Sequence, residues 1–228
     1  MERDLFPSTQ LSLLKSVSAG GTLPNAAMER VAELYWKPVY RFVRLKFHKD
    51  NEAAEDLTQQ FFATALERDF FRRFEPARAS FRTYLRMAVE HFAANEHAAA
   101  NRLKRGGGVV FEPMEDADAP GECPETIFES EWRRQVFTLA LDDLKRHCES
   151  AGKGVQWQVF EAYDLADLTE AARPSYADLA LLGGIAETSV TNYLAWARRM
   201  LRGFVEARLR GVTADDGELR REMRSLWS

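Results

Sequence analysis

Apolar residues recur at intervals of three and four along almost the whole chain, and alternating, strand-like stretches are absent apart from a short run at 109–111. This spacing is typical of amphipathic helices, because it gathers apolar side chains on one face of a helix with 3.6 residues per turn. The pattern therefore predicts an all-α protein. The expected helices cover residues 8–17, 25–48, 51–69, 79–104, 126–148, 154–167, 175–182, 187–209 and 216–226.

Glycine and proline residues divide this helical pattern into two parts. The triple glycine at 106–108 ends the fourth expected helix, and Pro113, Pro120 and Pro124 interrupt the stretch that follows. Proline favours such interruptions because it cannot donate the hydrogen bond that a helix interior requires. Eight acidic residues and no lysine or arginine lie between 112 and 131. We therefore expect two small helical domains joined by an acidic linker at 107–130.

Charge is strongly segregated along the chain, although the formal net charge is only −4. Residues 68–105 carry nine basic side chains against four acidic ones, and residues 198–210 carry five arginines against one acid. Basic segments of this kind favour an anionic partner such as nucleic acid, which the net charge alone would not indicate.

The segment 175–209 has the pattern of a helix-turn-helix. Pro174 and Ser175 are plausible start signals, Gly183 and Gly184 permit a tight turn, and a longer helix follows. In DNA-binding proteins of this kind the second helix enters the major groove, and arginines further along it contact phosphates. An ordinary helical hairpin with a solvated arginine face is the alternative that the pattern leaves open. The stripe expected to be buried is Ile185, Val190, Leu194, Ala197 and Leu201.

Aromatic residues are interleaved with arginines between 71 and 105. Aromatic rings beside cations suit single-stranded nucleic acid, because bases stack on the rings while arginines follow the backbone. Phe81, Leu85, Ala88 and Phe92 share one helical face, so we expect them in the core. Phe74 and the polar loop at 72–80 are harder to assign to a core, and a loop of this kind could receive a flipped base.

The expected helix at 51–69 has two different faces, and Asp50 and Asn51 are plausible N-caps for it. Leu57, Phe61 and Ala65 form an apolar side. An acidic face on the opposite side could steer the helix toward a basic partner. That face consists of Glu52, Asp56, Gln59, Ala63 and Glu67.

Several classes of protein are disfavoured by the sequence. The N-terminus lacks an apolar signal region and no apolar run approaches the ~18 residues of a membrane span, so we expect a cytoplasmic protein without membrane contact. Cys123 and Cys148 have no CxxC partners and are expected to be reduced. The four histidines are scattered, and no phosphate-binding loop occurs. We therefore expect no enzyme activity, no catalytic residues, no cofactor and no metal.

Four stretches of the chain resemble a known family when they are taken in order: "LYWKPVYRFVRLKF", "AEDLTQQFF", "FRTYLRMAVEHF" and "SYADLALLGGIAETSVTNYLAWARRML". Their order and spacing are similar to those of bacterial RNA polymerase sigma factors of the extracytoplasmic-function type, within the sigma-70 family. The resemblance covers essentially the whole chain. The helix-turn-helix alone is weakly specific, whereas the "EDLTQ" helix followed by "FRTYL" and then the hairpin is highly specific.

The resemblance implies a division of the chain into functional regions. Residues 25–106 would be sigma region 2, which binds core RNA polymerase and recognises and melts the minus-10 promoter element. Residues 131–211 would be sigma region 4, which reads the minus-35 element. The acidic linker at 107–130 would follow the nucleic-acid channel of the polymerase. Residues 1–24 would be an N-terminal extension, and residues 212–228 a C-terminal amphipathic tail.

The resemblance also implies three sets of site residues. Core polymerase binding is assigned to Glu52, Asp56, Leu57, Gln59, Gln60, Ala63 and Glu67. Minus-10 DNA binding is assigned to Arg72, Arg73, Phe74, Arg78, Ser80, Arg82, Arg86, His91 and Asn95. Minus-35 DNA binding is assigned to Thr188, Ser189, Thr191, Asn192, Ala195, Arg198, Arg199 and Arg202.

The chain departs from the family pattern at several of these positions. His91 and Asn95 stand where the family usually has Asn and Asp, and Thr191, Tyr193 and Trp196 stand where it usually has basic residues. Two explanations are open: readout of the minus-35 element is weak, or Tyr193 and Trp196 contact a neighbouring domain instead. We hypothesise that region 4 contributes less than region 2.

The C-terminal tail carries an apolar stripe at Leu219, Met223, Leu226 and Trp227. Two interpretations remain open: the tail caps region 4, or it docks between the two domains and hides DNA-binding surface. The expected partners are the largest and second-largest subunits of core RNA polymerase and promoter DNA, with an anti-sigma factor or a kinase-based regulator left open. The alternative functions are a stand-alone helix-turn-helix regulator and an all-helical protein-interaction adaptor.

Overall fold

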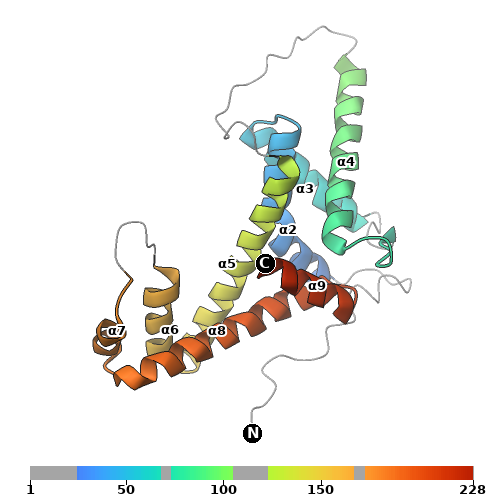
Figure 1. The fold of residues 1–228 in the computed structure, drawn as a ribbon. Helices are drawn as coiled ribbons and strands as arrows, with labels where there is room; N and C mark the ends of the chain where they lie inside the picture. Colours follow the sequence, from blue (N-terminus) through green and yellow to red (C-terminus); the bar gives the residue numbers. More distant parts are fainter. Residues whose placement is uncertain (1–24, 68–72, 105–122, 167–172, 228) are drawn as a thin grey trace. The chain divides into compact units, whose positions relative to one another are not determined.

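The computed structural model describes residues 25–67, 73–104, 123–166 and 173–227, and every regular element in these ranges is a helix (Figure 1). The all-α prediction is confirmed for this part of the chain. The expected helix at 8–17, the strand-like run at 109–111 and most of the acidic linker lie outside it. The elements are α2 (Asn25–Lys46), α3 (Asn51–Glu67), α4 (Phe81–Lys104), α5 (Pro124–Ser150), α6 (Gly154–Phe160), the π-helix η3 (Glu161–Leu165), α7 (Tyr176–Gly183), α8 (Glu187–Arg210) and α9 (Asp216–Leu226).

The chain divides into two compact units, which are described separately below. The first unit comprises residues 1–136 and 209–228, and the second comprises residues 137–208. The first unit therefore contains α2, α3, α4, the beginning of α5 and the whole of α9. The C-terminal tail is thus grouped with the N-terminal helices and not with α6, α7 and most of α8.

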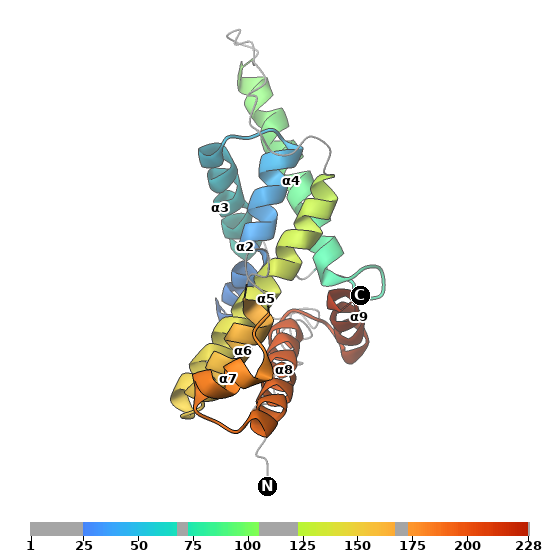
Figure 2. The same cartoon turned by 60° about the vertical axis from the view of Figure 1, so that its left-hand side comes forward.

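The core of the first unit is built largely from aromatic side chains. Helices α2, α3 and α4 pack against one another (Figure 2). The ring of Tyr35 meets Phe81 edge-on at 5.8 Å between centroids and stacks on Phe128 at 6.5 Å. Phe42 meets Phe128 edge-on at 5.9 Å between centroids. These contacts join α2 to α4 and to the beginning of α5, and burial raises the pKa of Tyr35, so its phenol stays protonated.

The helix α3 has the two faces that its sequence predicts. Its first turn is capped by Asp50, whose Oδ1 accepts a hydrogen bond from the backbone N–H of Ala53 at 2.8 Å. Leu57, Phe61 and Ala65 are buried. On the opposite side Glu52, Asp56, Gln59 and Ala63 are exposed, and the side chain of Glu67 lies outside the described residues.

Phe74 is buried in the first unit, contrary to the expectation that it lies outside the core. Its side chain is 4% exposed, and its ring meets Phe81 edge-on at 5.4 Å and lies 5.3 Å from Tyr84. Its neighbours Arg73 and Glu75 are exposed. A single apolar residue in a polar loop gives no periodic signal, so the sequence could not indicate that the loop folds back over α4.

The tail helix α9 buries most of the apolar stripe that its sequence predicts. Leu219, Met223 and Leu226 are buried, whereas Trp227 is 46% exposed. Asp215 caps the helix by accepting the backbone N–H of Glu218 at 2.8 Å. In addition, the guanidinium of Arg133 in α5 donates to the backbone carbonyl of Ser225 at 3.1 Å. The tail is therefore packed into the first unit at both of its ends.

The second unit contains the short helix, tight turn and longer helix that the sequence predicts for residues 175–209. Ser175 and Asp178 form a capping box at the start of α7, and Gly184 closes that helix in the left-handed conformation with φ of 59°. A residue with a Cβ would be strained at Gly184, because positive φ favours glycine. Of the predicted stripe on α8, Val190, Leu194 and Ala197 are buried, and Ile185 and Leu201 are partly buried.

Leu194→Ala should destabilise the second unit by about 2–5 kcal/mol, because the substitution leaves a cavity in a core where Leu194 is 1% exposed. Urea unfolding followed by circular dichroism measures the loss. The neighbouring exposed substitution Thr191→Ala is the control and should change stability by less than about 0.5 kcal/mol. Equal stabilities for the two variants would contradict the packing described here.

Candidate nucleic-acid interface

A pocket with a volume of about 510 Å³ lies between α3, the loop that follows it and α4 in the first unit. Phe61 from α3 and Tyr84 and Phe92 from α4 contribute aromatic rings to its lining. Arg73 from the loop and His91 and Asn95 from α4 contribute polar side chains. The pocket therefore combines ring surface with a cation and hydrogen-bonding groups, which is the chemistry that receives an unstacked base.

Three of the residues assigned to minus-10 binding meet at this pocket. Arg73, His91 and Asn95 are all exposed and all line it. Two further assigned residues lie nearby in the loop: Arg78 is exposed and ion-paired with Glu75 at 2.6 Å, and Ser80 caps α4 by accepting the N–H of Thr83 at 3.2 Å. Arg72 lies outside the described residues.

Tyr84 is a lining residue that the sequence analysis did not select. Burial raises the pKa of its phenol, and the nearby Arg73 opposes this effect only in part, so the hydroxyl stays protonated and can donate a hydrogen bond. A sequence signal existed, because Tyr84, Ala88, His91 and Asn95 follow one another at intervals of four, three and four on one face of α4.

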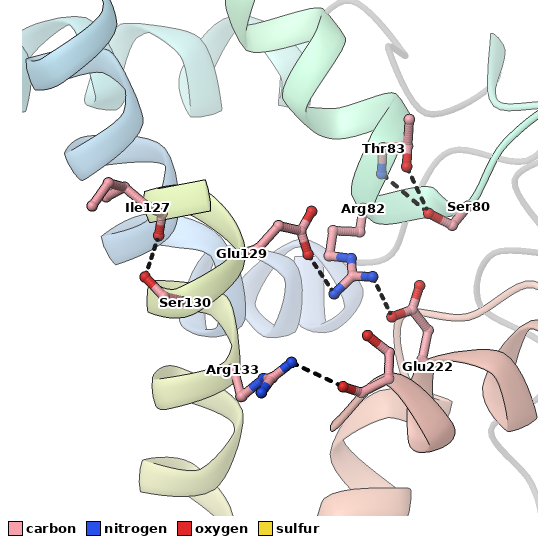
Figure 3. Close-up of polar contacts among 9 residues, drawn as sticks. Ser80, Arg82, Thr83, Ile127, Glu129, Ser130, Arg133 and Glu222 are labelled. Atoms are coloured by element: carbon pink, nitrogen blue, oxygen red, sulfur yellow. Dashed lines mark hydrogen bonds and ion pairs between the residues drawn. The ribbon is translucent and has the colours of Figure 1, made fainter. Parts of the chain in front are cut away.

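Arg82, which was also assigned to minus-10 binding, is occupied by acidic residues of the same unit. Its side chain is 14% exposed. Its guanidinium forms ion pairs with Glu129 of α5 at 2.7 Å and with Glu222 of α9 at 3.3 Å, and Figure 3 shows it lying between these two carboxylates. The guanidinium also lies over the ring of Trp132 at 4.0 Å. In this structure Arg82 is therefore not available to a phosphate.

Arg86 and Lys46 are also paired with acidic side chains. Glu125, in the first turn of α5, lies 3.5 Å from Arg86 and 2.7 Å from Lys46, and Lys46 also contacts Glu90 at 2.9 Å. The expected linker at 107–130 is wrong at its end, because α5 begins at Pro124 and contains Glu125 and Glu129. Both acids pair with basic side chains of α2 and α4.

The residues assigned to polymerase binding lie on the surface of α3, with one exception. Glu52, Asp56, Gln59, Gln60 and Ala63 are exposed, whereas Leu57 is 8% exposed and packs into the core. Within the described residues, Glu52 and Asp56 have no ion-pair partner. The acidic face of α3 is therefore open, unlike the acids of α5.

The residues assigned to minus-35 binding lie on one side of α8 in the second unit. All are exposed except Ser189, which is partly buried. Arg198 is held by two hydrogen bonds of 2.8 Å to the carboxylate of Asp164, and this partner raises the pKa of its guanidinium. The remaining assigned residues are Thr188, Thr191, Asn192, Ala195, Arg199 and Arg202.

Tyr193 and Trp196, which stand at family positions that are usually basic, pack against the core of their own unit. Trp196 lies 6.2 Å from the ring of His147, and the ammonium group of Lys153 lies 4.8 Å from its centroid. The hypothesis that both residues contact a neighbouring domain is therefore not needed to explain their apolar character.

Both cysteines are free thiols, as expected. No group of three or more His, Cys, Asp and Glu side chains is arranged for a metal ion in the part of the chain that the structure describes. In the same ranges, no helix has the length and apolar character to cross a bilayer. Comparisons of the chain with protein-family models, with curated proteins and with solved structures give no match.

The carboxyl group of Glu125 should titrate at about pH 2. Its pKa is lowered from 4.5 to about 2, first by a hydrogen bond from the thiol of Cys123 and then by one from Lys46. Because the folded-state pKa is depressed, the stabilisation is present above about pH 5 and is lost as the pH falls toward 2. NMR titration of the side-chain carboxyl carbon measures the midpoint. Cys123→Ala should raise that midpoint, and an unchanged midpoint would contradict the assigned contact.

Proposed function

We propose that the protein is a sigma factor of the extracytoplasmic-function type, which binds core RNA polymerase and directs promoter-specific initiation. In this proposal the first unit binds the polymerase and opens the minus-10 element, and the second unit reads the minus-35 element. The partners are the two largest subunits of the core enzyme and promoter DNA, and the protein acts in the cytoplasm, where both are found.

The observation that carries the proposal is the pocket between α3 and α4. Arg73, His91 and Asn95, which the family resemblance assigns to minus-10 binding, all line this pocket. Melting a promoter requires that a base leave its stack, which costs a few kcal/mol. Stacking of a base on an aromatic side chain returns about 1–3 kcal/mol. A ring-lined pocket with polar groups can therefore stabilise the opened strand.

The surface of α3 supports the polymerase-binding part of the proposal. Glu52, Asp56, Gln59 and Gln60 form an exposed polar face on a helix whose other side is buried. Since the structure supplies no basic partner for Glu52 and Asp56 within the described residues, these carboxylates are available to a basic surface of another protein. Such complementary charge increases the rate and selectivity of docking more than the affinity.

The second unit supports the minus-35 part of the proposal. The turn between α7 and α8 is tight, and the N-terminal part of α8 exposes Thr188, Thr191 and Asn192. Short polar side chains at these positions can reach base edges in a major groove, while Arg199 and Arg202 lie further along the helix for phosphate contacts. A stand-alone helix-turn-helix regulator would use this unit alone and would give the pocket of the first unit no function.

The direct test is run-off transcription with the purified protein, core RNA polymerase and a library of promoter fragments, together with co-purification of the core enzyme. We expect the protein to bind the core enzyme and to allow initiation from a subset of the fragments. The proposal would be abandoned if the protein neither bound the core enzyme nor supported initiation from any fragment.

Asp56→Arg should weaken binding to core polymerase about tenfold or more without changing the fold, because it reverses charge at the centre of an exposed acidic face. Affinity is measured by fluorescence anisotropy with labelled protein, and folding by circular dichroism. Glu149→Arg, at an exposed position of the second unit, makes the same change in net charge and serves as the control. Equal losses in the two variants would point to non-specific electrostatics.

Tyr84→Ala should weaken binding of single-stranded minus-10 DNA by about 1–3 kcal/mol, which corresponds to about 5- to 150-fold. The loss follows from the removal of a ring from the pocket lining. Tyr84→Phe keeps the ring and should retain most of the affinity. If Tyr84→Phe lost as much affinity as Tyr84→Ala, stacking in this pocket would not be the source of binding.

A further inference from the structure

Two buried carboxylates of α9 hold the start of α4 in the first unit. Glu218 is 2% exposed, and its Oε1 accepts the backbone N–H of Phe81, the first residue of α4, at 2.6 Å. Its Oε2 accepts the N–H of Ala214 at 2.7 Å. Glu222, one turn further along α9, is 5% exposed and pairs with Arg82. The tail therefore contacts adjacent residues of α4 through two acidic side chains.

These carboxylates occupy groups that ordinarily bind phosphate. The first N–H groups of a helix have no partner within the helix, and together with the helix dipole they favour an anion. A guanidinium group is a common ligand of phosphate oxygens. The N–H of Phe81 is a group of the first kind, and it donates to Glu218. The guanidinium of the adjacent Arg82 is a group of the second kind, and it pairs with Glu222.

Arg82 is held tightly but keeps unused hydrogen-bonding capacity. Glu129 and Glu222 contact its terminal nitrogens, and the ring of Trp132 covers one face of the guanidinium. Its Nε is buried without a hydrogen-bond partner in the part of the chain that the structure describes. The Oε2 atom of Glu222 likewise makes an ion pair without hydrogen-bond geometry. The ion pair between Arg82 and Glu222 is therefore weaker than the two hydrogen bonds that Glu218 accepts.

The environment of Glu222 supports this view of the contact. Burial raises the pKa of its carboxyl group, and the opposing effect of Arg82 is smaller. Glu218 and Glu129 also raise this pKa, whereas Arg221 lowers it. Burial and the two neighbouring carboxylates outweigh the two arginines, so the ionised form of Glu222 is buried at a cost.

We propose that α9 is an intramolecular lock, in which Glu222 together with Glu129 withholds Arg82 from nucleic-acid phosphates until the tail leaves the first unit. This inference rests on the proposed function, because it assigns a use to Arg82 in binding promoter DNA. Release of α9 exposes the N–H of Phe81 and removes Glu222 from Arg82, while Glu129 of α5 stays beside that guanidinium as a weaker competitor for a phosphate than the two carboxylates together. The pocket lined by Arg73, His91 and Asn95 has no α9 residue in its lining.

The lock is tested on the full chain with Glu222→Lys, which places a cation against Arg82. We expect this variant to bind a fluorescein-labelled single-stranded DNA of mixed sequence roughly tenfold more tightly than the unmodified protein, a size typical of coupling between sites. Glu149→Lys is the matched control, because it makes the same change in net charge at an exposed position. Equal affinities for Glu222→Lys and Glu149→Lys would overturn the lock.

Amide hydrogen exchange shows whether the tail has moved. Glu222→Lys should increase exchange in α9 and at Phe81, and truncation after Gly211 should increase DNA affinity in the same direction. Adding Arg82→Ala to Glu222→Lys should remove the gain in affinity. A tail that exchanges faster without a gain in affinity would reject the inhibitory role, and so would a gain that survives Arg82→Ala. A tail that stays protected in Glu222→Lys would also reject the lock.

Failure of the lock and failure of the proposed function are distinguishable in the same set of proteins. If the lock is wrong but the function is right, every tail variant still binds core polymerase and supports run-off transcription, with DNA affinity independent of residue 222. If the function is wrong, the unmodified protein does not bind core polymerase, and neither Asp56→Arg nor the tail variants change that result.

Discussion

The buried carboxylate of Glu218 fixes the C-terminal segment against the start of α4, and much of the first unit depends on this contact. It is 2% exposed and receives two backbone N–H groups, from Phe81 and Ala214. A buried carboxylate that lost these donors would carry a penalty of several kcal/mol. Displacement of α9 by one residue along α4 would break the hydrogen bond from Phe81. The position of Glu222 beside Arg82 follows from this register.

Charges that are separated in the sequence neutralise one another within the first unit. Lys46 and Arg86 meet Glu125, and Arg82 meets Glu129 and Glu222. Ion pairs that are partly exposed contribute only about 0–1 kcal/mol each to stability. Their main effect here is on availability, because a basic group that already contacts a carboxylate must exchange it before it can bind a phosphate. The acidic face of α3 has no such partner in the described ranges.

Local signals in the sequence predicted the helices and the helix-turn-helix well, because those signals act within a few residues. Ser175 with Asp178, Gly184 and the stripe at Val190 and Leu194 are all of this kind. The same holds for the two faces of α3. The packing of α9 onto α4 could not be predicted in this way, since Phe81 and Glu218 are 137 positions apart. Helical periodicity says which face is apolar but not which partner covers it.

In the candidate site, too, some residues can be identified from local sequence patterns, whereas the role of others depends on tertiary contacts. Arg73, His91 and Asn95 were assigned to minus-10 binding through the family resemblance, and they line the pocket. Phe74 and Arg82 belong to the same block, but one is in the core and the other is covered by acids of α5 and α9. If α9 acts as the proposed lock, DNA that reaches Arg82 can release α9 only because DNA binds the open state more tightly than the locked state. Because coupling is reciprocal, any partner that draws α9 away strengthens DNA binding by the same factor.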